Sequence, residues 1–401
     1  MLFCIFSVAV AFLAHVVDGI GLNDVVPDIE QDFISSLLKT LSSVMLVIST
    51  FAVASMLTAF ASATGATTAR AFSILIKDDV SQLALSVFIG TFIFSVVGSI
   101  ALATEYYAAA GKFALFVITI IFFAAVIFIL LKWVDRISNL GRIGHTISLV
   151  ENAAAEAVTN FLKNPFMCGA PRTARNGNFN DIFSKNNGYV RHLDMEELQK
   201  IATNLSTTIQ LNCRPGKYVH ENFSLANITS DVSFITEEIR DKILGCIVIG
   251  DERYFENDPR FGIITLSEIA SKALSPGIND PGTAIQIINA HGRIFFQWNK
   301  ATGDREILFD RVELPALELK DMLEDAFRPI ARDGANNIEV MMRLQKSLGY
   351  LKTIQNEEMR KYASLQSEEA YTRAESALTN HNDLNILKNE VRLVAETSKN
   401  L

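Results

Sequence analysis

The sequence has little of what metal sites and nucleic-acid binding require. Its 401 residues include four cysteines and six histidines, and 36 basic residues stand against 44 acidic ones. The cysteines form no CxxC pair, and no two histidines stand at a ligand spacing such as i, i+4. We therefore expect no metal centre. A role in binding nucleic acid is excluded, because it needs a basic face and neither half of the chain has a basic excess.

The common enzyme signatures are also missing. The sequence has no G-x-S-x-G, no P-loop and no G-x-G-x-x-G after a strand. His145 and His291 are conceivable bases, but a histidine with no partner group nearby in the sequence is more often a satisfied interface or surface residue. We predict that the protein is not an enzyme and has no cofactor.

Charge is scarce in the first third of the chain and ordinary in the rest. Residues 1–133 carry 13 of the 80 charged residues, whereas residues 134–401 carry the other 67, about one in four. The mean hydropathy of the whole chain is +0.24. This split predicts a membrane domain over residues 1–133, followed by a soluble region long enough to bury its own core.

Four uncharged runs in this first third predict four transmembrane helices. Residues 40–69, 80–104 and 113–131 form runs of 30, 25 and 19 residues, and a spanning helix needs roughly 20. The run over residues 1–17 is shorter and has no basic residue before it, which argues against a signal peptide. We expect it to be a first helix whose upstream part is missing, because Met1 already lies inside the apolar run.

The charges of the loops predict the orientation of these helices. The first loop, residues 18–36, contains five acidic residues and no basic one, so it is expected outside: Asp18, Asp24, Asp28, Glu30 and Asp32. The second loop has Arg70 and Lys77 and is expected in the cytoplasm. Further basic residues follow the last run: Lys132, Arg136 and Arg142. The soluble region is therefore predicted on the cytoplasmic side of the membrane.

The second apolar run is rich in hydroxyl side chains. The candidate residues for a pore lining are Ser42, Ser49, Thr50, Ser55 and Thr58. Small and hydroxyl residues also allow close helix packing, and that alternative stays open. No carboxylate lies deep in a span, which argues against a proton relay or an ion-coupled carrier.

The soluble region is predicted to have three parts. An amphipathic helical stalk is expected over residues 134–163, an α+β domain over 164–315 and a helical region over 316–401. The α+β domain is expected to start with a loop over residues 164–186, and to contain a strand at 188–193. We also expect a hairpin in which a strand at 209–213 turns at Pro215-Gly216 into a second strand. That second strand is expected to pass through Tyr218 and Val219 towards Leu225 and Ile228.

Several motifs in this region resemble one family. The runs Asp258–Gly262 (Asp-Pro-Arg-Phe-Gly) and Ala273–Ala284 (Ala-Leu-Ser-Pro-Gly-Ile-Asn-Asp-Pro-Gly-Thr-Ala), with Gly188–Val190 and Arg214–Gly216, resemble a large bacterial group of predicted membrane proteins, domain-of-unknown-function family 2254. The resemblance covers roughly residues 1–330. It implies an integral protein of a bacterial inner membrane with a cytoplasmic C-terminal domain, and it implies no established activity or catalytic residue.

The loop between the two motif helices is the best candidate site in the sequence. Its candidate ligand-binding residues are Ser275, Gly277, Asn279, Asp280 and Thr283. Two helix ends meet here, and a helix N-terminus can bind an anion, while Asn279 and Asp280 could coordinate a cation. The alternative is a tight connector whose proline, glycine and capping residues only fix the geometry.

The overall prediction is an α-helical membrane bundle followed by an α+β domain and a helical tail. An oligomeric channel that passes small ions, gated by the soluble domain, is the favoured function. The alternative is a membrane-anchored sensor or scaffold that binds a small ligand or a protein. The expected partners are the lipid bilayer and further copies of the chain.

Overall fold

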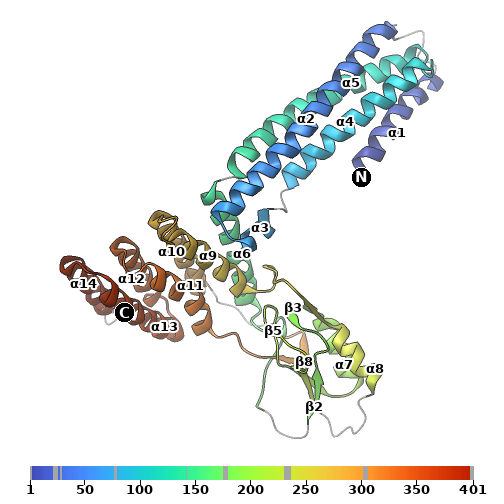
Figure 1. Cartoon of the computed structure of the whole chain (residues 1–401). Helices are drawn as coiled ribbons and strands as arrows, with labels where there is room; N and C mark the ends of the chain where they lie inside the picture. Colours follow the sequence, from blue (N-terminus) through green and yellow to red (C-terminus); the bar gives the residue numbers. More distant parts are fainter. Residues whose placement is uncertain are drawn as a thin grey trace. The chain divides into compact units, whose positions relative to one another are not determined.

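The computed structural model describes residues 2–20, 26–27, 29–75, 79–140, 142–174, 179–229, 236–300 and 306–397 (Figure 1). Contacts between residues divide the chain into two compact units, Met1–Thr146 and Ile147–Leu401. Three charges used to predict the orientation lie outside the described residues: Asp24, Asp28 and Lys77.

The first unit is a bundle of apolar helices. Its elements are α1 (Leu2–Val16), η1 (Val17–Ile20), α2 (Gln31–Ala66), α3 (Ala69–Leu75), α4 (Asp79–Ala103) and α5 (Ala109–Leu140). Helices α1, α2, α4 and α5 pack around buried side chains such as Leu38, Phe94 and Leu115. Large apolar side chains also point outward, including Phe51 at 63% exposure and Leu131 at 67%. An apolar surface on an apolar core is typical of a bundle surrounded by lipid.

Three of the four predicted spans are confirmed as helices long and apolar enough to cross a membrane. They cover Gln31–Ala63, Val80–Ala103 and Ala109–Asn139. Helix α1 has 15 residues, which at about 1.5 Å per residue is shorter than a hydrocarbon core of about 30 Å. The described residues therefore contain three candidate spans instead of four.

The predicted stalk is a separate helix. Helix α5 ends at Leu140, and α6 (Ile143–Lys163) starts three residues later. The apolar stripe of α6 is buried as its spacing predicts, with Ile147, Val150 and Ala154 fully covered. Most of α6 therefore belongs to the second unit.

The second unit begins with an α/β part that has one shared core. Among the described residues, five strands form a sheet in the order β1 (Gly169–Pro171), β8 (Phe309–Leu314), β4 (Thr208–Leu211), β6 (Ser224–Thr229) and β2 (Phe179–Phe183). Three more form a sheet in the order β5 (Tyr218–Val219), β3 (Gly188–Leu193) and β7 (Ile247–Gly250). Both sheets contribute to an apolar core with α7 (Met195–Asn204) and α8 (Glu237–Gly245).

Two predictions about these strands need correction. The first strand of the expected hairpin, β4, does pair antiparallel with the later part of its second strand, β6. No tight turn joins the two, because Tyr218–Val219 form a separate strand, β5, which pairs with β3 in the smaller sheet. The expected loop over residues 164–186 contains β1 and β2. Their pairing with distant strands, β8 and β6, outweighs the local turn signals of glycine, proline and asparagine. Residues 175–178 of that loop lie outside the described part.

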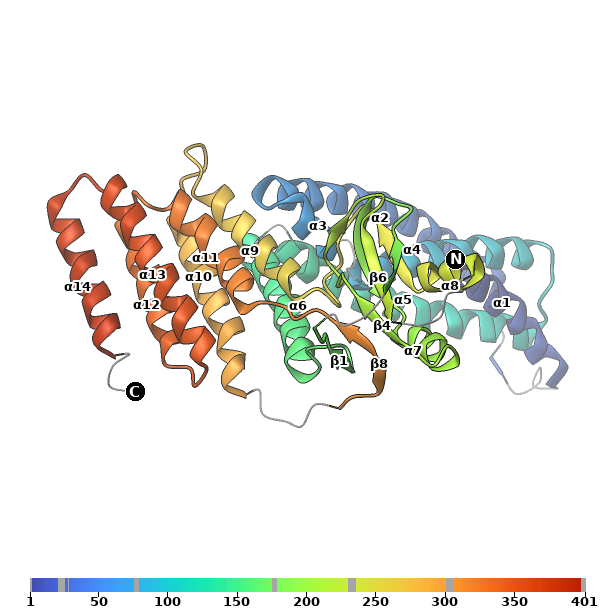
Figure 2. The ribbon, with the colours of Figure 1, turned by 90° about the horizontal axis from the view of Figure 1, so that it is seen from below.

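The rest of the second unit is a two-layered helical array. One layer consists of α9 (Pro259–Ala273), α11 (Leu319–Asp333) and α13 (Glu357–Ala377). The other consists of α10 (Pro281–Phe295), α12 (Ile338–Lys352) and α14 (His381–Thr397). Within each layer neighbouring helices pack side by side, as in α-solenoids (Figure 2). Helices α9 and α10, which the sequence placed in the α+β domain, thus pack with the helical tail.

Candidate functional site

In the connector between α9 and α10, the side chains of Asp280, Thr283 and Ser275 form hydrogen bonds with one another or with the nearby backbone. Asp280 is the N-cap of α10, and its carboxylate accepts hydrogen bonds from the backbone N–H of Thr283 (3.1 Å) and from the Thr283 hydroxyl (2.6 Å). The Thr283 hydroxyl bond lowers the pKa of Asp280 below its ordinary value, in spite of some burial. Ser275 donates its hydroxyl to the carbonyl of Lys272 (2.6 Å).

The backbone of this connector is equally well paired. The carbonyl of Ser275 accepts the N–H groups of Ile278 and Asn279, and the N–H of Asp280 donates to Ala273. Asn279 has a positive φ of 50°, which closes the turn. Gly277 is exposed, and a methyl group there would meet nothing within 4 Å. The structure thus brings Asp280 and Thr283 together, while Gly277 and Asn279 lie on the outside of a compact turn.

The five hydroxyl residues of α2 do not share one face of the helix. At about 100° per residue, Ser42 and Ser49 are about 20° apart, whereas Thr50 and Thr58 lie about 80° and 160° from Ser42. Ser42, Ser49 and Ser55 flank the stripe that packs inside the bundle, and they are partly buried. Thr50 and Thr58 are exposed on the other side.

The exposed hydroxyls are paired within their own helix. Thr50 donates to the carbonyls of Leu46 and Val47, and Thr58 donates to the carbonyl of Ala54 (2.9 Å). The Ser49 hydroxyl oxygen is buried and has no hydrogen-bond partner among the described residues. A path through one copy of the bundle would therefore meet at most part of the predicted set.

The family-like motifs meet at one buried carboxylate, Asp258. It caps α9 and is 3% exposed. It accepts a hydrogen bond from Nε of Arg253 (2.7 Å), and its Oδ2 lies 2.7 Å from Nη2 of the same arginine in an ion pair. Gly216 has a φ of 90°, and a methyl group on it would overlap the Asp258 carboxylate. The N–H of Gly216 donates to Val190 on β3 (2.8 Å). Burial raises the pKa of Asp258, and Arg253 opposes that rise.

The neighbouring motif residues also lock elements together. The Arg214 guanidinium donates to the backbone carbonyls of Pro165 and Pro315, both at 2.7 Å, and burial lowers its pKa to about 10. Gly262 lies against Ala154 of α6 so closely that a methyl group would overlap it. These motif residues join α6, the smaller sheet and the helical array.

A set of charged side chains that the sequence did not single out lines a groove on the α9, α11 and α13 layer. A hollow of about 460 Å³ lies between α9 and α11. Another of about 530 Å³ lies between α11 and α13, and Arg332 lines both. We call the two adjoining hollows the charged groove.

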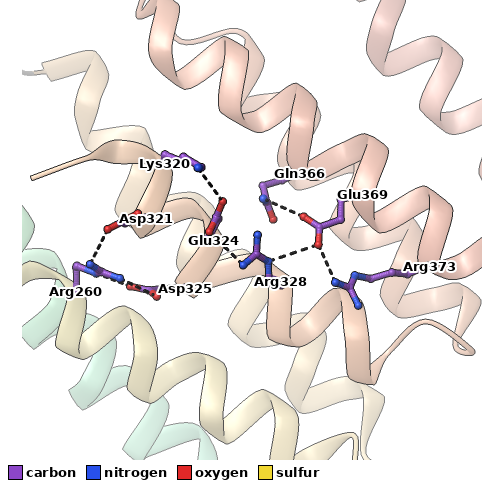
Figure 3. A network of polar contacts seen from close by, with 9 residues as sticks. All are labelled: Arg260, Lys320, Asp321, Glu324, Asp325, Arg328, Gln366, Glu369 and Arg373. Atoms are coloured by element: carbon purple, nitrogen blue, oxygen red, sulfur yellow. Dashed lines mark hydrogen bonds and ion pairs between the residues drawn. The ribbon is translucent and has the colours of Figure 1, made fainter.

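Ion pairs run along the charged groove from helix to helix (Figure 3). Arg260 on α9 holds Asp325 (2.7 Å) and Asp321 (2.9 Å) on α11. Further along, Arg328 on α11 contacts Glu369 on α13 (3.5 Å). The groove therefore ties three helices together through side chains that remain partly exposed.

The two hollows differ in the sign of their charge. Three arginines and four carboxylates line the α9–α11 hollow. Two arginines and one carboxylate line the α11–α13 hollow. A hydrogen bond from Arg373 lowers the pKa of that carboxylate, Glu369, so it stays ionised. The groove thus offers an acidic end and a basic end to one ligand.

Some ion pairs of the charged groove can be predicted from the sequence, because both partners lie on one helix. Glu324 and Arg328, like Glu369 and Arg373, are pairs at i, i+4 on one helix, a spacing that predicts contact. The contacts between helices have no such signal, because Arg260 is 61 residues away from Asp321.

His291 lies under the groove in the interior of the array. Its Nε2 is 3.1 Å from the hydroxyl of Ser267, which in turn donates to the carbonyl of Ala326. Complete burial lowers the pKa of His291 to about 3, so the imidazole is neutral at physiological pH. The Ser267 hydroxyl is thus committed to a backbone acceptor.

Comparison with known proteins points to one family. The model of a family described as "Predicted membrane protein (DUF2254)" matches residues 1–350. Uncharacterized proteins of Mycobacterium bovis and Mycobacterium tuberculosis are 29% identical to the chain over 111 residues, which are 27% of this chain. The match spans about a fifth (21%) of the length of those relatives. No solved structure matches the chain.

Proposed function

The chain belongs to the DUF2254 family of predicted membrane proteins, and from that premise we propose that it is a membrane-anchored binding protein. In this proposal the apolar bundle holds the protein in the bilayer, and the second unit binds a small charged ligand or a charged segment of a partner protein in the charged groove. Such a protein acts as a sensor or a scaffold.

One observation carries this proposal. Three helices that are far apart in the sequence present two adjoining hollows of opposite charge balance, joined at Arg332. Ligand sites are concave and contain a few polar groups that fix the orientation of the ligand. The α9–α10 connector offers less, because the carboxylate of Asp280 is already used by Thr283.

The orientation of the binding unit is part of the proposal. An acidic first loop and basic residues after the last span favour a cytoplasmic second unit. We place the protein in a bacterial inner membrane because relatives that it matches come from mycobacteria. In that setting the groove would be exposed to cytoplasmic solutes and proteins.

The experiment is a thermal-unfolding screen of the full-length protein in phosphatidylcholine nanodiscs. The probes are inorganic phosphate, L-glutamate, L-arginine and spermidine. We expect at least one probe to raise the melting temperature of the wild type and of K200Q equally, and to raise that of R328Q less. Lys200 is a matched control, since its ion pair with Glu196 lies on the exposed surface of α7. Equal responses of R328Q and wild type to every probe would contradict the proposal.

An oligomeric channel is a second candidate, and the buried hydroxyl of Ser49 favours it. An unpaired hydroxyl inside an apolar bundle is costly unless water or another copy of the chain reaches it. The test is a planar-bilayer recording under asymmetric KCl. A channel predicts a discrete conductance that falls in S49L and S55L and changes less in T50L, which lies on the other side of α2. Unaltered conductance in S49L would remove α2 from the pathway.

A further inference from the structure

The α11–α13 hollow collects the donors that an oxyanion requires. Arg332 comes from the last turn of α11 and Arg373 from α13, so two guanidinium groups from different helices border one space. Arginine forks match the oxygens of a phosphoryl group in pairs. The hollow, at about 530 Å³, has room for more than a bare phosphate ion.

One N–H donor of Arg373 is not used within the described part of the protein. Its Nη2 donates to Glu369 (2.7 Å), but its Nε is buried and has no hydrogen-bond partner in the part of the chain that the structure describes. A buried donor without an acceptor costs free energy. A ligand oxygen would recover that cost if the Arg373 side chain, which is 34% exposed, turned its Nε into the hollow. This unmet donor separates the α11–α13 hollow from the α9–α10 connector, where the side chains of Ser275, Asp280 and Thr283 are hydrogen-bonded.

Arg332 and two hydroxyls complete the lining. Asp333 occupies the Nε and Nη2 of Arg332, which leaves the rest of a fork of five donors on a side chain that is 62% exposed. Thr372 and Ser376 are one turn apart on α13, and each donates to a carbonyl of its own helix. Either hydroxyl can turn from that carbonyl to a ligand oxygen.

Glu369 repels an anionic ligand less than an unpaired carboxylate would. It accepts a hydrogen bond from Arg373 and lies 3.5 Å from Arg328, so two arginines already balance its charge (Figure 3). Among the side chains that line the hollow, the two arginines outnumber this one carboxylate. The lining itself therefore carries one more positive than negative charge, while Asp333 beside it pairs with Arg332.

We propose that the α11–α13 hollow is a phosphoryl-binding site formed by Arg332, Arg373, Thr372 and Ser376. This inference rests on the proposed function. It names a phosphoryl group as the chemical class of the ligand that binds at the basic end of the charged groove. The phosphoryl group can belong to a soluble phosphorylated molecule or to a phospholipid headgroup.

The experiment is isothermal titration of inorganic phosphate into the full-length protein in phosphatidylcholine nanodiscs. We expect saturable binding to the wild type, at least tenfold weaker binding to R373Q and R332Q, and unchanged binding to K200Q. R373K keeps the charge but loses the fork, so its affinity is expected between those of wild type and R373Q. Absence of phosphate binding to the wild type, or equal affinity of R373Q and wild type, would overturn the inference.

A second titration with dihexanoyl phosphatidic acid distinguishes the two sources. Binding that is tighter than that of phosphate and lost in R373Q supports a lipid headgroup, whereas tighter binding of phosphate supports a soluble ligand. If neither binds while L-arginine or spermidine still stabilises the wild type more than R328Q, the phosphoryl site is overturned and the proposed function stands. If no probe acts through the groove, both fail.

Discussion

The α9–α10 connector and the charged groove are both polar, and both lie in the helical array, but they use their polar groups differently. In the connector, Asp280, Thr283 and Ser275 bond to one another or to the local backbone. In the groove, ion pairs join helices, and a buried N–H of Arg373 has no acceptor among the described residues. An unusual run of residues can therefore be a rigid joint, whereas a binding surface can be assembled from residues that look ordinary in sequence.

The largest loss of stability is expected from the buried carboxylate that holds the motifs together. D258A would leave Arg253 without its partner and α9 without its cap. Breaking a buried ion pair in this way costs about 3–5 kcal/mol of the free energy of unfolding. Chemical denaturation of the full-length protein measures this, with D251A at an exposed position nearby as the control. A loss below about 1 kcal/mol would contradict the role of Asp258.

A smaller loss is expected in the connector. D280A removes the N-cap of α10 and should cost about 1 kcal/mol, while D280N can still cap and should stay close to wild type. The same denaturation measurement checks both variants. Neither variant should change the response to phosphate or L-arginine. If a connector variant stayed folded but lost that response, the ligand would bind at Ser275–Asp280 and not in the charged groove.

The pH dependence of the cap gives a finer test of the same difference. The pKa of Asp280 is lower in the folded protein than its ordinary value of 3.8, so its charge stabilises the fold above that value. This contribution is lost as the pH falls through the lowered pKa. Wild type should therefore lose stability relative to D280N between pH 5 and the acid side of pH 3.8. If the free energy of unfolding of wild type and D280N changed with pH in the same way, the stabilising role of the Asp280 charge at the helix N-terminus would be contradicted.

The smallest effect on stability is expected in the groove. Arg328 is 47% exposed, and its ion pairs are screened by solvent. R328Q should therefore change the free energy of unfolding by less than about 1 kcal/mol while it weakens binding. Denaturation and titration of the same samples separate the two quantities. A loss of several kcal/mol in R328Q would instead mean that the ion pairs of the charged groove mainly stabilise the fold.

The sequence predicts the local features of the fold well. Proline and aspartate at Asp258-Pro259 and Asp280-Pro281 start α9 and α10 at the expected residues, and the uncharged runs give the three long spans. These features depend on capping, proline geometry and hydropathy, which act within a few residues.

The features that the sequence does not predict depend on distant contacts. Strand β1 has only three residues, ends in proline and forms because β8 lies beside it about 140 residues later. The groove likewise needs α9 and α11 to pack before Arg260 can meet Asp325, and α11 and α13 to pack before Arg328 can meet Glu369. No local pattern encodes that stacking.

The most direct test of binding in the groove is segment-resolved hydrogen–deuterium exchange of the full-length protein in nanodiscs. Exchange is compared without a probe and with phosphate, L-glutamate, L-arginine or spermidine. The account predicts that a stabilising probe slows exchange in α11 and α13 and leaves residues 275–280 and α2 unchanged. Slower exchange confined to residues 275–280 or to α2, with α11 and α13 unchanged, would contradict it.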